Sequence, residues 1–100
     1  MAELDGVRAE LARRVAAIPA GSRRRDLAPE LDAIRAIAHR AGLHPAVTVA
    51  HLLDDALARG EHGALVRGWL GLLGEAVACP RTDRAACDAF AAACAVRLAG

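Results

Sequence analysis

The 100-residue sequence has very few aromatic side chains and contains no Lys, Asn, Gln or Tyr. One Trp and one Phe provide no row of rings on which the bases of a nucleic acid could stack. Three Cys and nine Gly exclude a disulfide-dense scaffold and a collagen-like chain. No uninterrupted apolar run reaches the roughly 18 residues of a membrane-spanning helix, and charges interrupt 1–14 where a signal peptide needs an apolar core. We therefore expect a cytoplasmic protein that makes no membrane contact.

The chain is instead rich in Ala, with 26 residues, and in Leu, with 13, and 55% of all residues are apolar. This apolar content excludes an intrinsically disordered chain, and the length fits a single helical domain covering 1–100. Ala, Leu and Arg have high helix propensity, and β-branched residues are few. The composition therefore predicts an all-α fold, and its bias is typical of a GC-rich bacterial coding sequence.

Apolar residues recur at spacings of three and four over five segments, which predicts five amphipathic helices. We place them at about 2–17, from Asp26 to 41, from Pro45 to 59, at 64–78, and from a cap at Thr82 or Asp83 onward. Pro19 ends the first helix, and Asp26 is a good N-cap for the second. Pro29 then falls in the first turn, where proline is tolerated. Gly42 followed by Leu43 predicts a Schellman-type ending for the second helix.

Short connections between about five helices predict a small antiparallel bundle. The polar linker 19–25 permits movement, so we expect the first helix, 1–18, to dock less firmly than the others. The segment 64–78 is apolar on nearly all sides, interrupted only by Arg67 and Glu75, and such a helix needs more than one neighbour. Those neighbours come either from within a five-helix monomer or from a second copy that completes the bundle as a symmetric homodimer.

A homodimer is expected to use the apolar side chains of this fourth helix, together with the first helix. The predicted interface residues are Leu65, Trp69, Leu70, Leu72 and Leu73. Trp69 is the natural anchor, because aromatic side chains concentrate binding energy at the centres of interfaces. The alternative is that Trp69 fills the core of a monomer.

The formal net charge of +1 creates no global field that would attract nucleic acid. Residues 1–25 nevertheless hold six Arg against three acidic residues. Three of the six are consecutive, Arg23, Arg24 and Arg25, and are candidates for contacting an anion or a nucleic acid. The alternative is a solvated loop whose Arg side chains pair with Asp26 or with acids of the second and third helices. Nucleic acid is therefore a secondary candidate partner.

Residues suited to catalysis or metal binding are few and scattered. The three Cys form no Cys-x-x-Cys pair, which predicts reduced thiols, with Cys87 and Cys94 on an apolar helix face and Cys79 accessible in a loop. Of the four His, only His51 has a possible co-ligand one turn away, Asp55, and zinc needs four ligands. Hydroxyl side chains are scarce, and no phosphate-binding loop is present. We therefore predict no catalytic residue, no metal site, no cofactor and no small-molecule substrate.

The segment 37–53 resembles a helix-turn-helix. Ala38, Gly42 and Leu43 stand at the positions of the small packing residue, the turn glycine and the apolar residue that follows it. The resemblance implies a DNA-binding regulator that uses residues 37–57. The segment departs from the motif because the expected buried valine is one place out of step. The helix that would read the bases also carries two adjacent acids and lacks the side chains that contact base edges.

The stretch 38–42, Ala-His-Arg-Ala-Gly, is similar to the phosphorylated helix of histidine phosphotransfer bundles. The similarity implies that His39 would carry the phosphoryl group. It departs from that family because glycine stands three residues after the histidine, where the family has lysine, and the chain contains no Lys. The sequence as a whole favours a small non-catalytic interaction or adaptor protein that binds a second copy of itself or another protein.

Overall fold

Five helices joined by short turns make up the computed structural model, which describes residues 2–19, 21–60 and 64–99. The helices are α1 (Ala2–Ala16), α2 (Arg24–Ala41), α3 (His44–Ala58), α4 (Ala64–Ala78) and α5 (Arg84–Ala99). These ranges contain no strand, so the predicted all-α fold of about five helices is confirmed. In the same ranges, no helix combines the length and apolar character needed to cross a bilayer.

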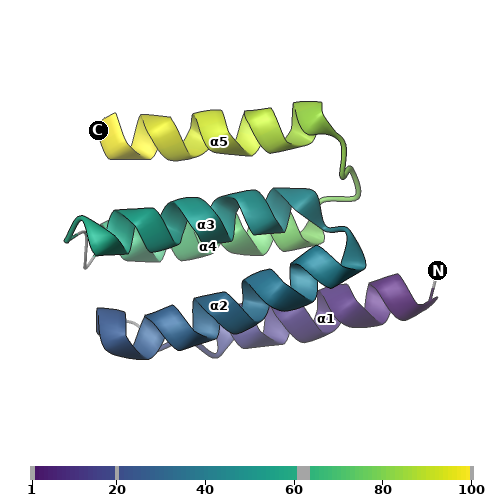
Figure 1. Cartoon of the computed structure of the whole chain (residues 1–100), viewed down its shortest axis with the longest axis horizontal. Helices are drawn as coiled ribbons and strands as arrows, with labels where there is room; N and C mark the ends of the chain where they lie inside the picture. The colour runs from purple at the N-terminus through teal and green to yellow at the C-terminus, as the bar shows by residue number, and fades with distance from the viewer. Residues whose placement is uncertain (1, 20, 61–63, 100) are drawn as a thin grey trace.

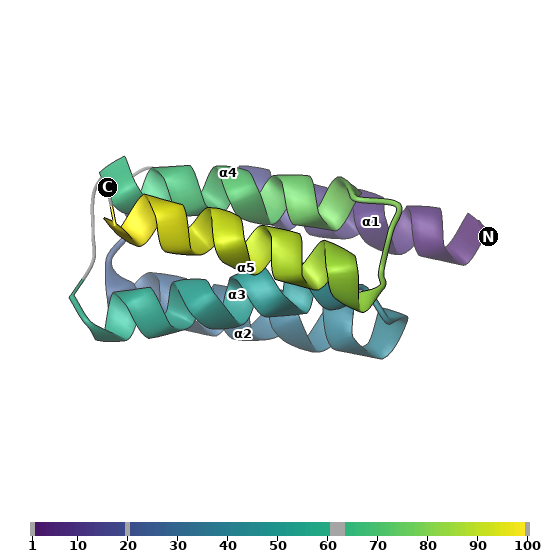
Figure 2. The ribbon, with the colours of Figure 1, turned by 90° about the horizontal axis from the view of Figure 1, so that it is seen from above.

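Consecutive helices run in opposite directions (Figure 1). The first four form a square, in which α1 packs on α2, α2 on α3, α3 on α4, and α4 back on α1. The fifth helix, α5, lies outside this square, against both α3 and α4 (Figure 2). As a result α3 and α4 each pack against three helices, whereas α1 and α2 each pack against two.

The core lies between the four helices of the square and consists of aliphatic side chains around a single Trp. Its largest fully buried side chains include Leu11, Leu27, Leu31, Ile34, Leu53, Trp69 and Leu73. A large aliphatic side chain contributes roughly 1.5–3 kcal/mol when it leaves water in this way. Buried Ala38, Ala46, Ala50 and Ala56 lie among them, and their small size lets neighbouring helices approach closely.

The start of α2 differs from the prediction. The helix begins at Arg24, with Arg23 as its N-cap and no capping bond from that side chain. The backbone N–H groups of Asp26 and Leu27 both donate to the carbonyl of Arg23 at 2.9 Å. The prediction that Asp26 caps the helix is therefore wrong, because Asp26 already lies in the first turn. Its negative charge there still interacts favourably with the positive end of the helix dipole.

The earlier start of α2 also changes the position of Pro29 within the helix. Because α2 starts upstream, Pro29 lies in the interior of the helix rather than in its first turn, which corrects the predicted position. Proline has no N–H, so the carbonyl of Arg25 receives no bond from the residue four positions ahead. The helix continues through this point without a break as far as Ala41.

Two predicted helix ends are confirmed. Gly42 has a φ of 75°, its N–H donates to the carbonyl of His39 at 3.1 Å, and the N–H of Leu43 donates to Ala38 at 2.9 Å. This is the Schellman pattern, and Leu43 is buried as the pattern requires. At the start of α5, Asp83 is the cap, because its Oδ1 accepts the N–H of Ala86 at 2.9 Å.

The first helix, α1, closes the fourth side of the square. Leu11 is fully buried against the core, and the Arg8 guanidinium donates to the carbonyl of Cys79 at 3.3 Å, just beyond the end of α4. The turn that follows α1 is held by Ser22, whose hydroxyl donates to the carbonyl of Pro19 at 2.6 Å. That the first helix docks less firmly than the others remains a prediction.

Candidate interaction surface

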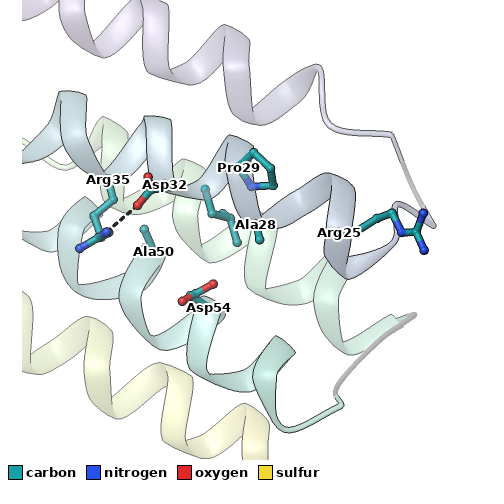
Figure 3. Close-up of a pocket in the computed structure, with 8 residues that line it drawn as sticks. Arg25, Ala28, Pro29, Asp32, Arg35, Ala50 and Asp54 are labelled. Atoms are coloured by element: carbon teal, nitrogen blue, oxygen red, sulfur yellow. Dashed lines mark hydrogen bonds and ion pairs between the residues drawn. The ribbon is translucent and has the colours of Figure 1, made fainter.

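A groove of about 410 Å³ runs between α2 and α3. It is lined by Arg25, Ala28, Pro29, Leu31, Asp32, Arg35, Ala50 and Asp54. Figure 3 shows Asp54 reaching toward α2 from α3, while Arg25 points away past the start of α2. Asp32 is already neutralised, since the Arg35 guanidinium lies 2.6 Å from its Oδ1. The described residues of the lining carry no hydroxyl, thiol or imidazole, so they offer no such nucleophile.

A second hollow, the α1–α4 notch, is more apolar and has a volume of about 250 Å³. Its lining residues are Val15, Ile18, Pro19, Gly21, Ser22, Leu27, Val66, Arg67, Leu70 and Gly71. Three helices meet here, because α1 ends, α2 begins and α4 begins at the same end of the bundle (Figure 1). The notch is therefore a surface hollow with an aliphatic floor, and Arg67 is the charged side chain among the described residues of its lining.

The local sequence explains why the notch is open. Pro19 stops α1, and Ile18 is left half-buried beside the end of that helix. On α4, Leu70 is also half-buried, and the next residue is Gly71. Apart from its chain neighbours and the backbone of its own helix, a methyl group placed on Gly71 would meet no heavy atom within 4 Å, so the space over Gly71 is open.

Exposed arginines lie at this end of the bundle. Arg23 and Arg24 follow directly after Ser22 at the start of α2, and both are exposed, as is Arg67. The ion pairs found among the described residues include none of these three. The pairing considered as the alternative for Arg23, Arg24 and Arg25, with Asp26 or with acids of α2 and α3, is also not among those ion pairs. Of these three, Arg67 lines the notch, and Arg23 and Arg24 directly follow its lining residue Ser22, so the described residues leave positive charge without an ion pair at this end of the bundle.

The opposite side of the α1 terminus differs in charge. A groove of about 370 Å³ between α1 and α2 shares Ile18 and Ser22 with the notch. Here the Arg14 guanidinium bridges Glu10 at 3.2 Å and Glu30 at 3.5 Å, so its charge is compensated. The two sides of the α1 terminus therefore offer a partner different electrostatic surroundings.

The predicted interface residues lie mostly in the core. Trp69 is 1% exposed, Leu72 4% and Leu73 0%, whereas Leu70 is half-buried in the notch. The side chain of Leu65 lies outside the described residues. Burial therefore favours the alternative role of Trp69 as a core residue. The physical reason is that α5 provides α4 with a third neighbour inside the same chain.

The notch contains residues that the sequence does not single out as a site. Apolar spacing places Val15 and Ile18 only on the inner stripe of the first helix, and Gly71 only on a glycine-bearing side of the fourth. The glycine spacing of three, from Gly68 to Gly74, is the available signal for a hollow on that side. What the spacing cannot give is the position of the α1 terminus beside Leu70.

Thiols and imidazoles show no clustering in the described part of the chain. Cys94 is buried, as predicted, whereas Cys87 is only half-buried, like Cys79. His51 lies 3.6 Å from Asp55 on the exposed side of α3. No group of three or more His, Cys, Asp or Glu within the described ranges could hold a metal ion. One of the four histidines, His62, lies outside those ranges.

The carboxyl groups with shifted pKa values belong to structural pairs on the surface. Hydrogen bonding and charge from Arg13, with a smaller effect of Arg14, lower the pKa of Glu10. The N–H of Ala86 and the Arg81 guanidinium lower the pKa of Asp83. Neither carboxyl lines the grooves described above, so these shifts reflect ion pairing and helix capping rather than acid–base chemistry.

The structure also shows where the two segments that resemble known motifs lie. The helices α2 and α3 lie side by side in antiparallel directions (Figures 1 and 2). His39 is exposed on α2 and lines a shallow hollow of about 340 Å³ with Arg35, Ala36, Arg40 and Val47. The two helices of a helix-turn-helix usually cross at about 90–120°, which places the second helix differently from α3.

The fold and these surfaces define an all-α bundle of five helices with an apolar notch at one end. Comparison of the chain with protein-family models, curated proteins and solved structures gives no match. The chemistry of its own surface is therefore the basis for a functional proposal.

Proposed function

We propose that the protein is a non-catalytic helical interaction module that binds a partner at the α1–α4 notch. The observation that carries this proposal is an aliphatic hollow, formed by α1, α2 and α4, that the described residues leave open. Half-buried Ile18 and Leu70 retain apolar area in contact with water, and a partner side chain that covers them gains roughly 25 cal/mol for each Å² removed from water.

The lining residues support binding rather than catalysis. Ser22 is the single hydroxyl among the residues that line the notch, and it already donates its proton to the carbonyl of Pro19 at 2.6 Å. Among the described residues, that lining holds no histidine or carboxylate to act as a base. A nucleophilic serine needs a base within hydrogen-bond reach, so the local geometry favours a turn-forming role for Ser22.

Crosslinking from Gly71 identifies a partner at this surface. A photo-crosslinking amino acid is introduced at Gly71, which is exposed and lines the notch, and in a matched variant at Ala89, which is exposed on α5. We expect a protein adduct from position 71 and none from position 89 when native cells are irradiated. Equal labelling from both positions, or no adduct from position 71, would contradict the proposal.

A second copy of the chain is one occupant that this experiment can detect. The helices expected to form a homodimer, α1 and α4, are two of the three that line the notch. An adduct of two identical chains from position 71 would support self-association. An adduct with nucleic acid would instead favour the secondary partner considered for Arg23, Arg24 and Arg25.

A further inference from the structure

We infer that the notch binds an acidic amphipathic segment of another protein, with an apolar side chain in the hollow and carboxylates facing Arg23, Arg24 and Arg67. This inference rests on the proposed function and adds the chemistry of the partner. It combines three observations at one end of the bundle: an aliphatic floor, open space over Gly71, and exposed arginines without an ion pair among the described residues, of which Arg67 lines the hollow and Arg23 and Arg24 follow its lining residue Ser22.

The size of the hollow suits an inserted side chain. Pockets for drug-sized ligands usually occupy about 300–1,000 Å³, and the notch encloses about 250 Å³. Its floor of Val15, Leu27 and Val66 offers dispersion contacts but no hydrogen-bond partners from the side chains. A leucine-type side chain anchored on a helix therefore fits the site better than a free polar metabolite, as in other helix-in-groove complexes.

The charge at the rim selects against a second copy of the chain. A two-fold interface brings the same patch of both copies together, with residue i of one copy against residue j of the other, so the arginine-bearing patch would lie against an equally positive patch. Like charges brought together across an interface cost several kcal/mol. The same three side chains attract an acidic segment, because no ion pair among the described residues compensates them.

The apolar floor also favours a protein over a nucleic acid. Phosphate binding needs basic side chains but gains nothing from an aliphatic hollow. The chain has one Trp and one Phe, and Trp69 is buried in the core, where it is not accessible to a base. An acidic amphipathic helix, by contrast, uses both the hollow and the arginines.

Three synthetic helical peptides test this chemistry with the full-length protein. The first has leucine along one face and glutamate on both flanks, the second replaces its leucines by serine, and the third replaces its glutamates by lysine. Fluorescence anisotropy of labelled peptide measures binding. We expect the first peptide to bind at least tenfold more tightly than either of the others, and its affinity to fall with added salt.

Matched protein variants test the location of the site. The variant Arg23→Glu/Arg67→Glu should weaken binding of the acidic peptide at least tenfold. The control Arg40→Glu/Arg84→Glu changes the same number of exposed arginines away from the notch and should leave affinity within twofold. Leu70→Ser should also weaken binding, whereas Val96→Ser on α5 should not. Circular dichroism checks that all four variants remain folded.

Other occupants of the notch would give different results in the peptide-binding and crosslinking experiments. Equal binding of all three peptides, absence of binding, or equal loss in the control variant would overturn the inference. Displacement of the acidic peptide by a DNA duplex of about the same length, with tighter binding of the duplex, would assign the arginines to nucleic acid. A protein adduct from position 71 without acidic-peptide binding would leave the proposed function standing and reject only this partner chemistry.

Discussion

At the scale of single residues, the stability of this bundle depends on a few well-defined side chains. Trp69 is the largest fully buried side chain, and its indole Nε1 is buried without a hydrogen-bond partner among the described residues. Asp83 forms the clearest helix cap. These two residues act through different physical effects, apolar burial for Trp69 and charge-assisted hydrogen bonding for Asp83. The loss of stability caused by substituting each of them should therefore depend differently on pH.

Substitutions of Trp69 measure its role in the core. We expect Trp69→Ala to lower the free energy of unfolding by roughly 3–5 kcal/mol, as for other aromatic residues truncated in cores. Trp69→Phe should cost clearly less, because it keeps an aromatic ring and removes a buried N–H that has no partner among the described residues. Urea denaturation followed by circular dichroism gives both values. Equal losses for the two variants would contradict the assignment of Trp69 to the core through burial of its aromatic ring.

Substitutions of Asp83 test the cap and its pH dependence. The folded pKa of Asp83 lies below its ordinary value of 3.8, because the N–H of Ala86 and the Arg81 guanidinium stabilise the carboxylate. The stabilisation is therefore present above the unfolded pKa and is lost as pH falls through the folded pKa. Asp83→Ala should lower the melting temperature at pH 7, and this difference from wild type should shrink in acid. A difference that is constant from about pH 7 to about pH 2 would contradict the assignment.

At the scale of helices, α2 and α4 each contain residues that reduce helix stability without a packing reason. Pro29 lies inside α2 and is exposed. Gly71 and Gly74 lie inside α4, and a methyl group added to either would meet no heavy atom within 4 Å. The helices form despite these residues because their apolar faces are buried against two or three neighbours. Local propensity is thus overridden by tertiary packing.

Replacement of Pro29 should stabilise the protein. Pro29→Ala restores an N–H that can donate to the carbonyl of Arg25 and removes the clash of the ring with the preceding turn. Proline in a helix interior is about 3 kcal/mol less favourable than alanine, and the greater freedom of the unfolded chain offsets roughly 0.4–1 kcal/mol. We expect a rise of about 2 kcal/mol in the free energy of unfolding, measured in urea. No rise would indicate that the helix is already distorted to accommodate the ring.

Substitutions of Gly71 and Gly74 in α4 distinguish an effect on stability from an effect on binding. Gly71→Ala and Gly74→Ala should each raise the free energy of unfolding by about 0.5–1 kcal/mol, because alanine restricts the unfolded chain and meets no steric obstacle. Gly71 lines the notch, whereas Gly74 does not. Only Gly71→Ala should therefore weaken binding of the acidic peptide. An equal effect of both variants on binding would place the partner elsewhere on α4.

At the scale of the whole molecule, the position of α5 decides how the apolar fourth helix is covered. The helix α4 packs against α1, α3 and α5, so its core-facing side chains are buried within one chain. The arginines around the notch also disfavour a face-to-face contact between two copies. A stable homodimer is consequently not needed to cover Trp69, Leu72 or Leu73.

Sedimentation equilibrium over a wide concentration range tests this conclusion. We expect the mass of a single chain, 10.4 kDa, at every concentration and at both low and moderate salt. A mass that doubles with concentration would restore the homodimer as the main proposal. If that dimer were lost in Leu70→Ser but not in Val96→Ser, the notch would be its interface.

The apolar spacing along the chain determined the helices, because segments rich in Ala and Leu with a period near 3.6 residues can leave water only by packing as helices. Residue types close in sequence also determined the Gly42 ending and limited the cap of the fifth helix to Thr82 or Asp83, because the bonding partners of such ends lie within five residues. The core role of Trp69 and the uncovered notch were decided by tertiary structure alone. Both depend on where α1 ends and where α5 lies relative to α4, and contacts between residues so distant in sequence leave no trace in local periodicity.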